Sequence, residues 1–188
     1  MSDEKRLSIY LSGLLRHRPE KIGLEMDSQG WVSVKQLITN VNAAGKYHLT
    51  MELLERIVET DDKQRYRFNA DRSRIAACQG HSVPGVRPEL QYLQPPEILY
   101  HGTTRASWKT IKRCGFISRM NRHAVHLHAT EAEAWRSAGR RRQEAVVLKV
   151  QARKLWQDGV DIGMAFNGVW CAERVDLQYI WETLSDPE

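Results

Sequence analysis

Side chains that could hold a phosphate group stand at two places in the sequence. Arg16 and His17 are adjacent, and Arg65 and Arg67 are two residues apart, so on a strand they would share a face. Arginine binds phosphate oxygens through paired hydrogen bonds, and a terminal phosphate monoester carries more charge than a diester. A cluster of these residues could therefore select a terminal phosphate, although solvated surface cations have the same spacing.

Two short polar segments could orient a ligand. Gln79-Gly80-His81-Ser82 combines a glycine, which permits close backbone approach, with three polar side chains. A simple turn at the end of a strand explains this segment equally well. His101-Gly102-Thr103-Thr104 follows an apolar strand, where it could cradle a nucleotide ribose or pyrophosphate.

Histidines and arginines in the second half allow further hypotheses. His126 and His128 would share a strand face near His123, but no nearby carboxylate completes a set of zinc ligands, so we expect no metal site. Gly139-Arg140-Arg141-Arg142 follows an expected helix and could hold a diphosphate. A positively charged, solvated helix end explains that run equally well.

The elements that must position these residues differ between the two halves. Apolar spacing predicts a helix over residues 4–18 that Pro19 ends, so Arg16 and His17 stand at its C-terminus. A strand over 31–34 leads into a second helix, and Thr50 caps a third. Alternation over 65–68 and 74–77 predicts a β-hairpin. Helices followed by a hairpin describe a winged-helix lobe.

The sequence of the second half predicts many short strands and a few helices. Strands are expected at 98–100, 124–129, 145–150, 169–170 and 179–181. One helix contains Trp108 and Ile111 and ends at Gly115, and Thr130 begins a capping box for another. This pattern indicates an α+β domain, and the missing Gly-x-Gly-x-x-Gly argues against a Rossmann site.

Composition sets the broad class of the chain. Its 188 residues are 41% hydrophobic and 27% charged, typical of a globular protein, and glycines and prolines over 80–96 suggest a boundary between domains 1–94 and 95–188. The net charge of +5 permits a polyanion partner without establishing one. No apolar run could span a membrane, and the polar N-terminus is unlike a signal peptide, so we expect an intracellular protein, cytoplasmic if bacterial. Three scattered cysteines argue against disulfides.

Seven motifs in their order along the chain resemble the tRNA 2′-phosphotransferase family, from about Leu7 to Trp181. They are Leu14-Leu15-Arg16-His17-Arg18-Pro19, Gly30-Trp31-Val32, Lys63-Gln64-Arg65-Tyr66, Ile75-Ala76-Ala77-Cys78-Gln79-Gly80-His81-Ser82, Leu99-Tyr100-His101-Gly102-Thr103, Arg122 with Val125-His126-Leu127, and Asn167-Gly168-Val169-Trp170. The resemblance implies a winged-helix RNA lobe followed by an ADP-ribosyltransferase-like lobe. It also implies an internal RNA 2′-phosphate as substrate, NAD as co-substrate, no metal, no membrane and a monomer.

The resemblance assigns roles residue by residue. The family's catalytic residues map onto Arg16, His17, Arg65 and Arg122, with Arg65 chosen over Arg67 on the Lys-x-Arg-aromatic match. Its ADP-ribosyltransferase signature maps onto His101, His126 and Val169. NAD binding is further expected of Gly102, Thr103, Arg140 and Asn167, and RNA binding of Arg67, Gln79, His81 and Ser82. The chain departs from the family pattern at Ala124, usually His or aromatic there, and at Cys171-Ala172-Glu173, where an aliphatic residue and Thr are usual.

The implied reaction has two steps. The RNA 2′-phosphate attacks C1″ of NAD and nicotinamide leaves, which requires positioning and charge stabilisation but no base, because the phosphate is already anionic. The 2″-OH of the ADP-ribose then attacks phosphorus, giving 2′-OH RNA and ADP-ribose 1″,2″-cyclic phosphate. His17 is the side chain best suited to protonate the leaving RNA oxygen.

Two alternatives stay open. A mono-ADP-ribosyltransferase acting on protein or on nucleic-acid ends would use a catalytic Glu, for which Glu173 is the candidate. A winged-helix regulator with an NAD-sensing lobe would bind NAD without turnover.

Overall fold

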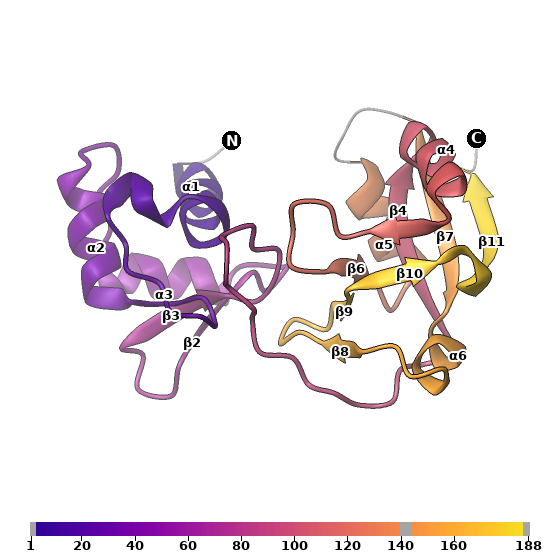
Figure 1. The fold of residues 1–188 in the computed structure, drawn as a ribbon. Helices are drawn as coiled ribbons and strands as arrows, with labels where there is room; N and C mark the ends of the chain where they lie inside the picture. Colours follow the sequence, from indigo (N-terminus) through magenta and orange to yellow (C-terminus); the bar gives the residue numbers. More distant parts are fainter. Residues whose placement is uncertain (1–2, 140–143, 186–188) are drawn as a thin grey trace. The chain divides into compact units, whose positions relative to one another are not determined.

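The computed structural model describes residues 3–139 and 144–185, and the chain separates into two compact units, residues 1–89 and 90–188. Figure 1 draws the N-terminal unit in indigo to magenta and the C-terminal unit in magenta to yellow. The division between Glu89 and Leu90 lies within the glycine- and proline-containing connector. It precedes the division expected after residue 94 by a few residues.

The N-terminal unit combines helices with one small antiparallel sheet, whose strand order is β1-β3-β2 (Figure 1). Its elements are α1 (Asp3–His17), the 3-10 helix η1 (Pro19–Ile22), β1 (Trp31–Ser33), α2 (Val34–Ala43), α3 (Met51–Glu59), β2 (Tyr66–Phe68) and β3 (Arg74–Ala77). The expected hairpin is therefore confirmed as β2 and β3.

Local chemistry explains where these helices begin and what they bury. The Ser33 hydroxyl accepts a hydrogen bond from the Gln36 amide at the start of α2, and Thr50 does the same for Leu53 at the start of α3. Leu11 and Leu15 of α1 pack with Leu37 of α2 in one apolar core. These leucines hold one face of α1 against the core. Arg16 and His17 follow in the last turn of the same helix.

The C-terminal unit contains most of the strands. Its elements are β4 (Ile98–Thr104), α4 (Arg105–Cys114), β5 (Phe116–Ser118), β6 (Val125–Leu127), α5 (Glu131–Ala138), β7 (Ala145–Gln151), α6 (Ala152–Gln157), β8 (Ile162–Met164), β9 (Trp170–Ala172), β10 (Arg174–Asp176), η3 (Leu177–Tyr179) and β11 (Ile180–Ser185). The sheets are β11-β7-β4, β6-β9-β8 and the pair β10-β5, all with antiparallel pairing. Mixed helices and small sheets confirm the α+β class.

Several expectations for the C-terminal unit need adjustment. The segment expected to follow a strand, His101 to Thr104, belongs to β4, because it pairs with β7 through Thr104. The helix α6 and the strands β5, β8 and β10, each three to six residues long, were not predicted. The capping box at Thr130 is confirmed, with Glu133 as its partner. Among the described helices, none is both long and apolar enough to span a membrane.

Candidate functional site

The C-terminal end of α1 presents two of the candidate phosphate ligands. Arg16 and His17 lie in the last turn, where the unpaired helix carbonyls favour cations. Arg16 is half-buried and His17 is exposed. Pro19 begins η1 directly afterwards, so the helix ends as expected.

The segment expected to orient a ligand, residues 79–82, closes against this helix end. The Ser82 amide donates to the Arg16 carbonyl at 2.8 Å, and the Ser82 hydroxyl shares a 2.8 Å hydrogen bond with Nδ1 of His17. Gly80 has a φ of +89°, and a Cβ atom there would lie 3.7 Å from Arg16 Cδ. The structure therefore brings Arg16, His17 and Ser82 together within the N-terminal unit.

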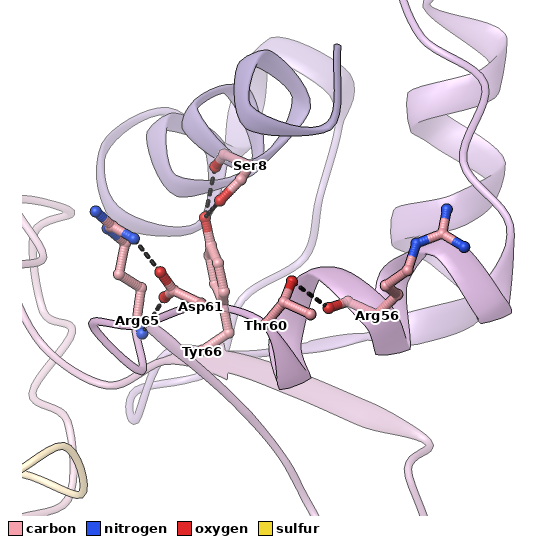
Figure 2. Close-up of polar contacts among 6 residues, drawn as sticks. All are labelled: Ser8, Arg56, Thr60, Asp61, Arg65 and Tyr66. Atoms are coloured by element: carbon pink, nitrogen blue, oxygen red, sulfur yellow. Dashed lines mark hydrogen bonds and ion pairs between the residues drawn. The ribbon is translucent and has the colours of Figure 1, made fainter. Parts of the chain in front are cut away.

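Arg65 is held by an acidic partner that sequence reasoning did not identify (Figure 2). Its guanidinium forms an ion pair with Asp61, and its backbone amide donates to the other Asp61 oxygen. The Asp61 side chain is only 5% exposed, so the carboxylate is fixed in place. Next along the chain, the Tyr66 hydroxyl donates to the Ser8 carbonyl of α1, which links the hairpin to that helix.

Arg67 has different surroundings from Arg65. Its guanidinium forms a 3.1 Å ion pair with Glu89, and its Cζ lies 4.7 Å from the centre of the Trp31 ring. A stacked and ion-paired arginine is committed to the unit's own packing. Both arginines are ion-paired, and only Arg67 is also stacked on an aromatic ring, so the choice of Arg65 as the phosphate ligand stays a prediction from the motif match.

Two buried groups of the hairpin region have pKa values that burial and the nearby arginines shift in opposite directions. Burial raises the pKa of the Tyr66 hydroxyl, while the charges of Arg16 and Arg65 act on it in the opposite direction. Burial likewise raises the pKa of Cys78 to about 11, against the charges of Arg67 and Arg16.

The two remaining candidates of this segment are more enclosed. His81 is fully buried, and a Cβ at Gly30 would lie 2.7 Å from its Nε2, so glycine is needed there. Gln79 Oε1 is buried and accepts no hydrogen bond from any residue that the structure describes. Such an oxygen is a candidate acceptor for a ligand donor.

In the C-terminal unit, His101 is oriented by a backbone carbonyl. Its Nδ1 donates to the His126 carbonyl at 2.9 Å, because a carbonyl oxygen can only accept. Burial lowers the pKa of His101, and the hydrogen bond to His126 opposes that shift. The ring is therefore neutral near pH 7, with its lone pair on Nε2.

The packing of β4 against α5 requires a glycine at position 102. A Cβ at this position would lie 2.0 Å from the Ala134 carbonyl oxygen of α5, which is an impossible contact. The glycine therefore allows α5 to pack on β4, and the structure explains its presence without a nucleotide. Neighbouring Thr103 is half-buried on the same strand.

Arg122 and His126 lie next to each other. The Arg122 Nη1 donates to His126 Nδ1 at 3.2 Å. His126 is in β6 and is paired in register with Cys171 of β9. Asn167 and Val169 belong to the turn between β8 and β9, which the Ala165 amide closes by donating to the Val169 carbonyl. Arg140, the remaining NAD candidate, lies outside the described residues.

Comparison with known proteins now gives the family. The profile of the RNA 2′-phosphotransferase, Tpt1 / KptA family matches residues 2–174. The chain belongs to this family. A protein of Burkholderia pseudomallei is 42% identical over 93% of this chain and 93% of its own length, and one of Pseudomonas fluorescens is 39% identical over 92% and 93%. A Fusobacterium nucleatum protein is 36% identical over 96% and 99%; all three are named probable RNA 2′-phosphotransferases.

Membership of the RNA 2′-phosphotransferase family confirms the resemblance seen in the motifs. Two partners were nevertheless missed at the sequence level, Asp61 beside Arg65 and Cys171 opposite His126. The spacing of four between Asp61 and Arg65 is a helical signal, but Asp61 lies in the loop after α3. Cys171 was noted only as a departure, because strand register cannot be read from spacing.

Proposed function

We propose that this RNA 2′-phosphotransferase family member removes an internal 2′-phosphate from RNA, as at a tRNA splice junction, by transferring it to NAD. The observation that carries the proposal is the convergence at the end of α1. Ser82 bonds to both the Arg16 carbonyl and the His17 ring, and the Tyr66 hydroxyl ties the hairpin that follows Arg65 to α1. Two arginines and a histidine suit a dianionic phosphate better than a diester.

The N-terminal unit acts as a winged-helix RNA lobe in this proposal. Its three helices and the β2–β3 hairpin support that interpretation. Gln79 and Ser82 contact the nucleotides beside the phosphate, and Arg67 faces the RNA backbone. His81 was expected to bind RNA as well, but it is fully buried and instead supports this segment from inside the unit.

In the first step a phosphate oxygen forms a bond to C1″ of NAD as the bond to nicotinamide breaks. Arg16, His17 and Arg65 hold the phosphate, and Arg122 stabilises the charge of the transition state. The Asp61 ion pair fixes the Arg65 fork before substrate arrives, which reduces the reorganisation needed for the reaction.

In the second step the 2″-hydroxyl releases its proton to solvent as its oxygen bonds to phosphorus, and the bond between phosphorus and the RNA 2′-oxygen breaks. His17 supplies the proton for that leaving oxygen. Its hydrogen bond to Ser82 fixes the ring, so the other ring nitrogen is presented at a defined position.

The C-terminal unit acts as an ADP-ribosyltransferase-like NAD lobe. The lone pair on His101 Nε2 is suited to accept a hydrogen bond from a ribose hydroxyl. His126, Thr103, Asn167 and Val169 line the rest of the NAD contact surface. Glu173 lines a separate pocket with Phe116, Ser118 and Tyr179, and none of the proposed NAD ligands is among that pocket's lining residues.

The test is a product analysis with one RNA oligonucleotide that carries a single internal 2′-phosphate. With NAD, the expected products are 2′-OH RNA, nicotinamide and ADP-ribose 1″,2″-cyclic phosphate; without NAD, the RNA should be unchanged. Dephosphorylation independent of NAD would overturn the proposal. Stable ADP-ribosylated RNA that needs Glu173 would favour a mono-ADP-ribosyltransferase, and NAD binding without turnover would favour a sensor.

A further inference from the structure

Three metal-ligating side chains meet in the C-terminal unit. His126 of β6 and Cys171 of β9 are register partners, so their side chains lie on the same face of the sheet. His123 precedes β6, and its ring centre lies 5.7 Å from that of His126. One donor atom from each of the three residues lies within 4.8 Å of the other two.

The spacing of these donors is close to that of a bound ion. An ion centred among atoms at most 4.8 Å apart would lie no more than about 2.8 Å from each. Zinc bonds are about 2.3 Å to sulfur and about 2.0–2.1 Å to imidazole nitrogen. Each donor atom therefore needs to move by no more than about 0.8 Å to complete the coordination.

The donor set selects the class of ion. Two imidazoles and a thiolate suit zinc and similar borderline or soft ions, whereas magnesium and calcium require oxygen ligands. We propose that His123, His126 and Cys171 bind one Zn²⁺-class ion, with the fourth position left for water.

Binding changes the protonation of the thiol. Cys171 is 2% exposed, and burial raises its pKa to about 12, so without an ion it is a neutral thiol. When the ion binds, the S–H bond breaks, the metal–sulfur bond forms and the proton goes to solvent. The bound ion then has one negative ligand and two neutral ones.

The ion also competes with the Arg122–His126 hydrogen bond. Arg122 can only donate, so His126 Nδ1 must accept and Nε2 of the neutral ring must carry the proton. An ion on Nδ1 displaces Arg122 directly, and an ion on Nε2 moves the proton to Nδ1, where it faces the Arg122 donor. Either way the ion separates Arg122 from His126, so we expect inhibition of the enzyme; this consequence rests on the proposed function.

The binding test uses the whole chain without an affinity tag. Zn²⁺ is titrated against a colorimetric chelator, and Co²⁺ is followed by its thiolate charge-transfer absorption. We expect one ion per chain, with affinity reduced at least about tenfold in Cys171→Ala and in His123→Ala. Cys114→Ala is the matched control, because Cys114 is exposed on α4, and it should bind as the unaltered chain does.

Three binding results would overturn the site: no stoichiometric ion, equal affinity in Cys171→Ala, or loss of the ion in Cys114→Ala. Circular dichroism checks the fold of each variant, and His123→Ala provides the decision if Cys171→Ala is unfolded. The binding result does not depend on whether the protein acts on RNA.

The activity test then examines whether ion binding inhibits the enzyme. Stoichiometric Zn²⁺ should lower NAD-dependent turnover at least tenfold, and a chelator should restore it, while Cys171→Ala should keep its turnover in the presence of the ion. Equal inhibition of both proteins would overturn the coupling. An absence of turnover before zinc is added would instead count against the proposed function.

Discussion

The two units prepare their candidate ligands by different means. In the N-terminal unit, charged side chains are held by other side chains: Arg65 by Asp61, and His17 by Ser82. In the C-terminal unit, the neutral His101 is held by the backbone of a neighbouring strand, and Gly102 lets a helix pack against its own strand. A phosphate requires concentrated positive charge, whereas a ribose requires uncharged hydrogen-bonding groups at fixed positions.

This difference between the two units predicts whether a substitution will affect catalysis or folding. In the N-terminal unit, removing one charged side chain should affect catalysis more than folding. In the C-terminal unit, changing a tightly packed backbone position should affect folding first.

The sharpest test separates two arginines on one hairpin. Arg65→Ala should lower turnover of 2′-phosphorylated RNA by about 10²–10³-fold, because one preorganised charge on the phosphate is lost. Arg67→Ala should lower it less than about tenfold, since Arg67 is stacked on Trp31 and paired with Glu89. Single-turnover rates measure both. A larger loss in Arg67→Ala would reverse the assignment of the phosphate ligand.

Replacing His17 should slow the second step of the reaction and leave the first step intact. In His17→Ala, ADP-ribosylated RNA should accumulate, and its conversion should slow by about a hundredfold or more, because the leaving oxygen lacks its acid. Gel analysis of a single-turnover time course measures both species. Arg18→Ala is the control, since Arg18 is the exposed neighbour of His17. If His17→Ala forms no intermediate, the residue acts in the first step.

In the C-terminal unit the largest effect is expected at Gly102. Gly102→Ala forces a methyl group against the Ala134 carbonyl oxygen and should destabilise that unit by about 3 kcal/mol or more. Its Tm should fall by roughly 12–24 °C, measured by calorimetry. Gly139→Ala is the matched control, because no atom lies within 4 Å of the added carbon. An unchanged Tm in Gly102→Ala would show that α5 can shift away from β4.

The sequence was a good guide to elements whose signals are local. Pro19 predicted the end of α1, Thr50 predicted the start of α3, and alternating residues predicted the β2–β3 hairpin. The strand β8 was missed because three residues carry too little pattern. The position of Arg16 and His17 in the last turn of α1 was predicted in the same way, while their role in the site stays a prediction.

Long-range partners could not be predicted in this way. Asp61 meets Arg65 through a loop conformation, and Cys171 meets His126 through strand register. The packing of α5 that requires Gly102 also depends on tertiary structure. Each of these contacts is decided by how elements pair, which residue type and local spacing do not specify.

The smallest predicted effect concerns Asp27, which holds the turn before β1. Burial alone would raise its pKa, but hydrogen bonds from the Trp31 and Gln29 amides, together with Arg74, outweigh burial and hold the pKa below its ordinary value of 3.8. The unfolded chain therefore binds a proton more readily at this residue, so its contribution is present above about pH 4 and is lost as the pH falls below that value.

Asp27→Asn should remove this pH dependence at a cost below about 1 kcal/mol at neutral pH, because the carboxylate is partly exposed. Urea unfolding followed by far-UV circular dichroism, at about pH 6 and about pH 3, measures the difference between the two proteins. The variant should be less stable than the unaltered chain at the higher pH and nearly equal to it at the lower pH. An equal difference in the free energy of unfolding at both pH values would mean that hydrogen-bond geometry, not charge, holds the turn. This part of the N-terminal unit would then be held as His101 is in the C-terminal unit, by uncharged hydrogen bonds.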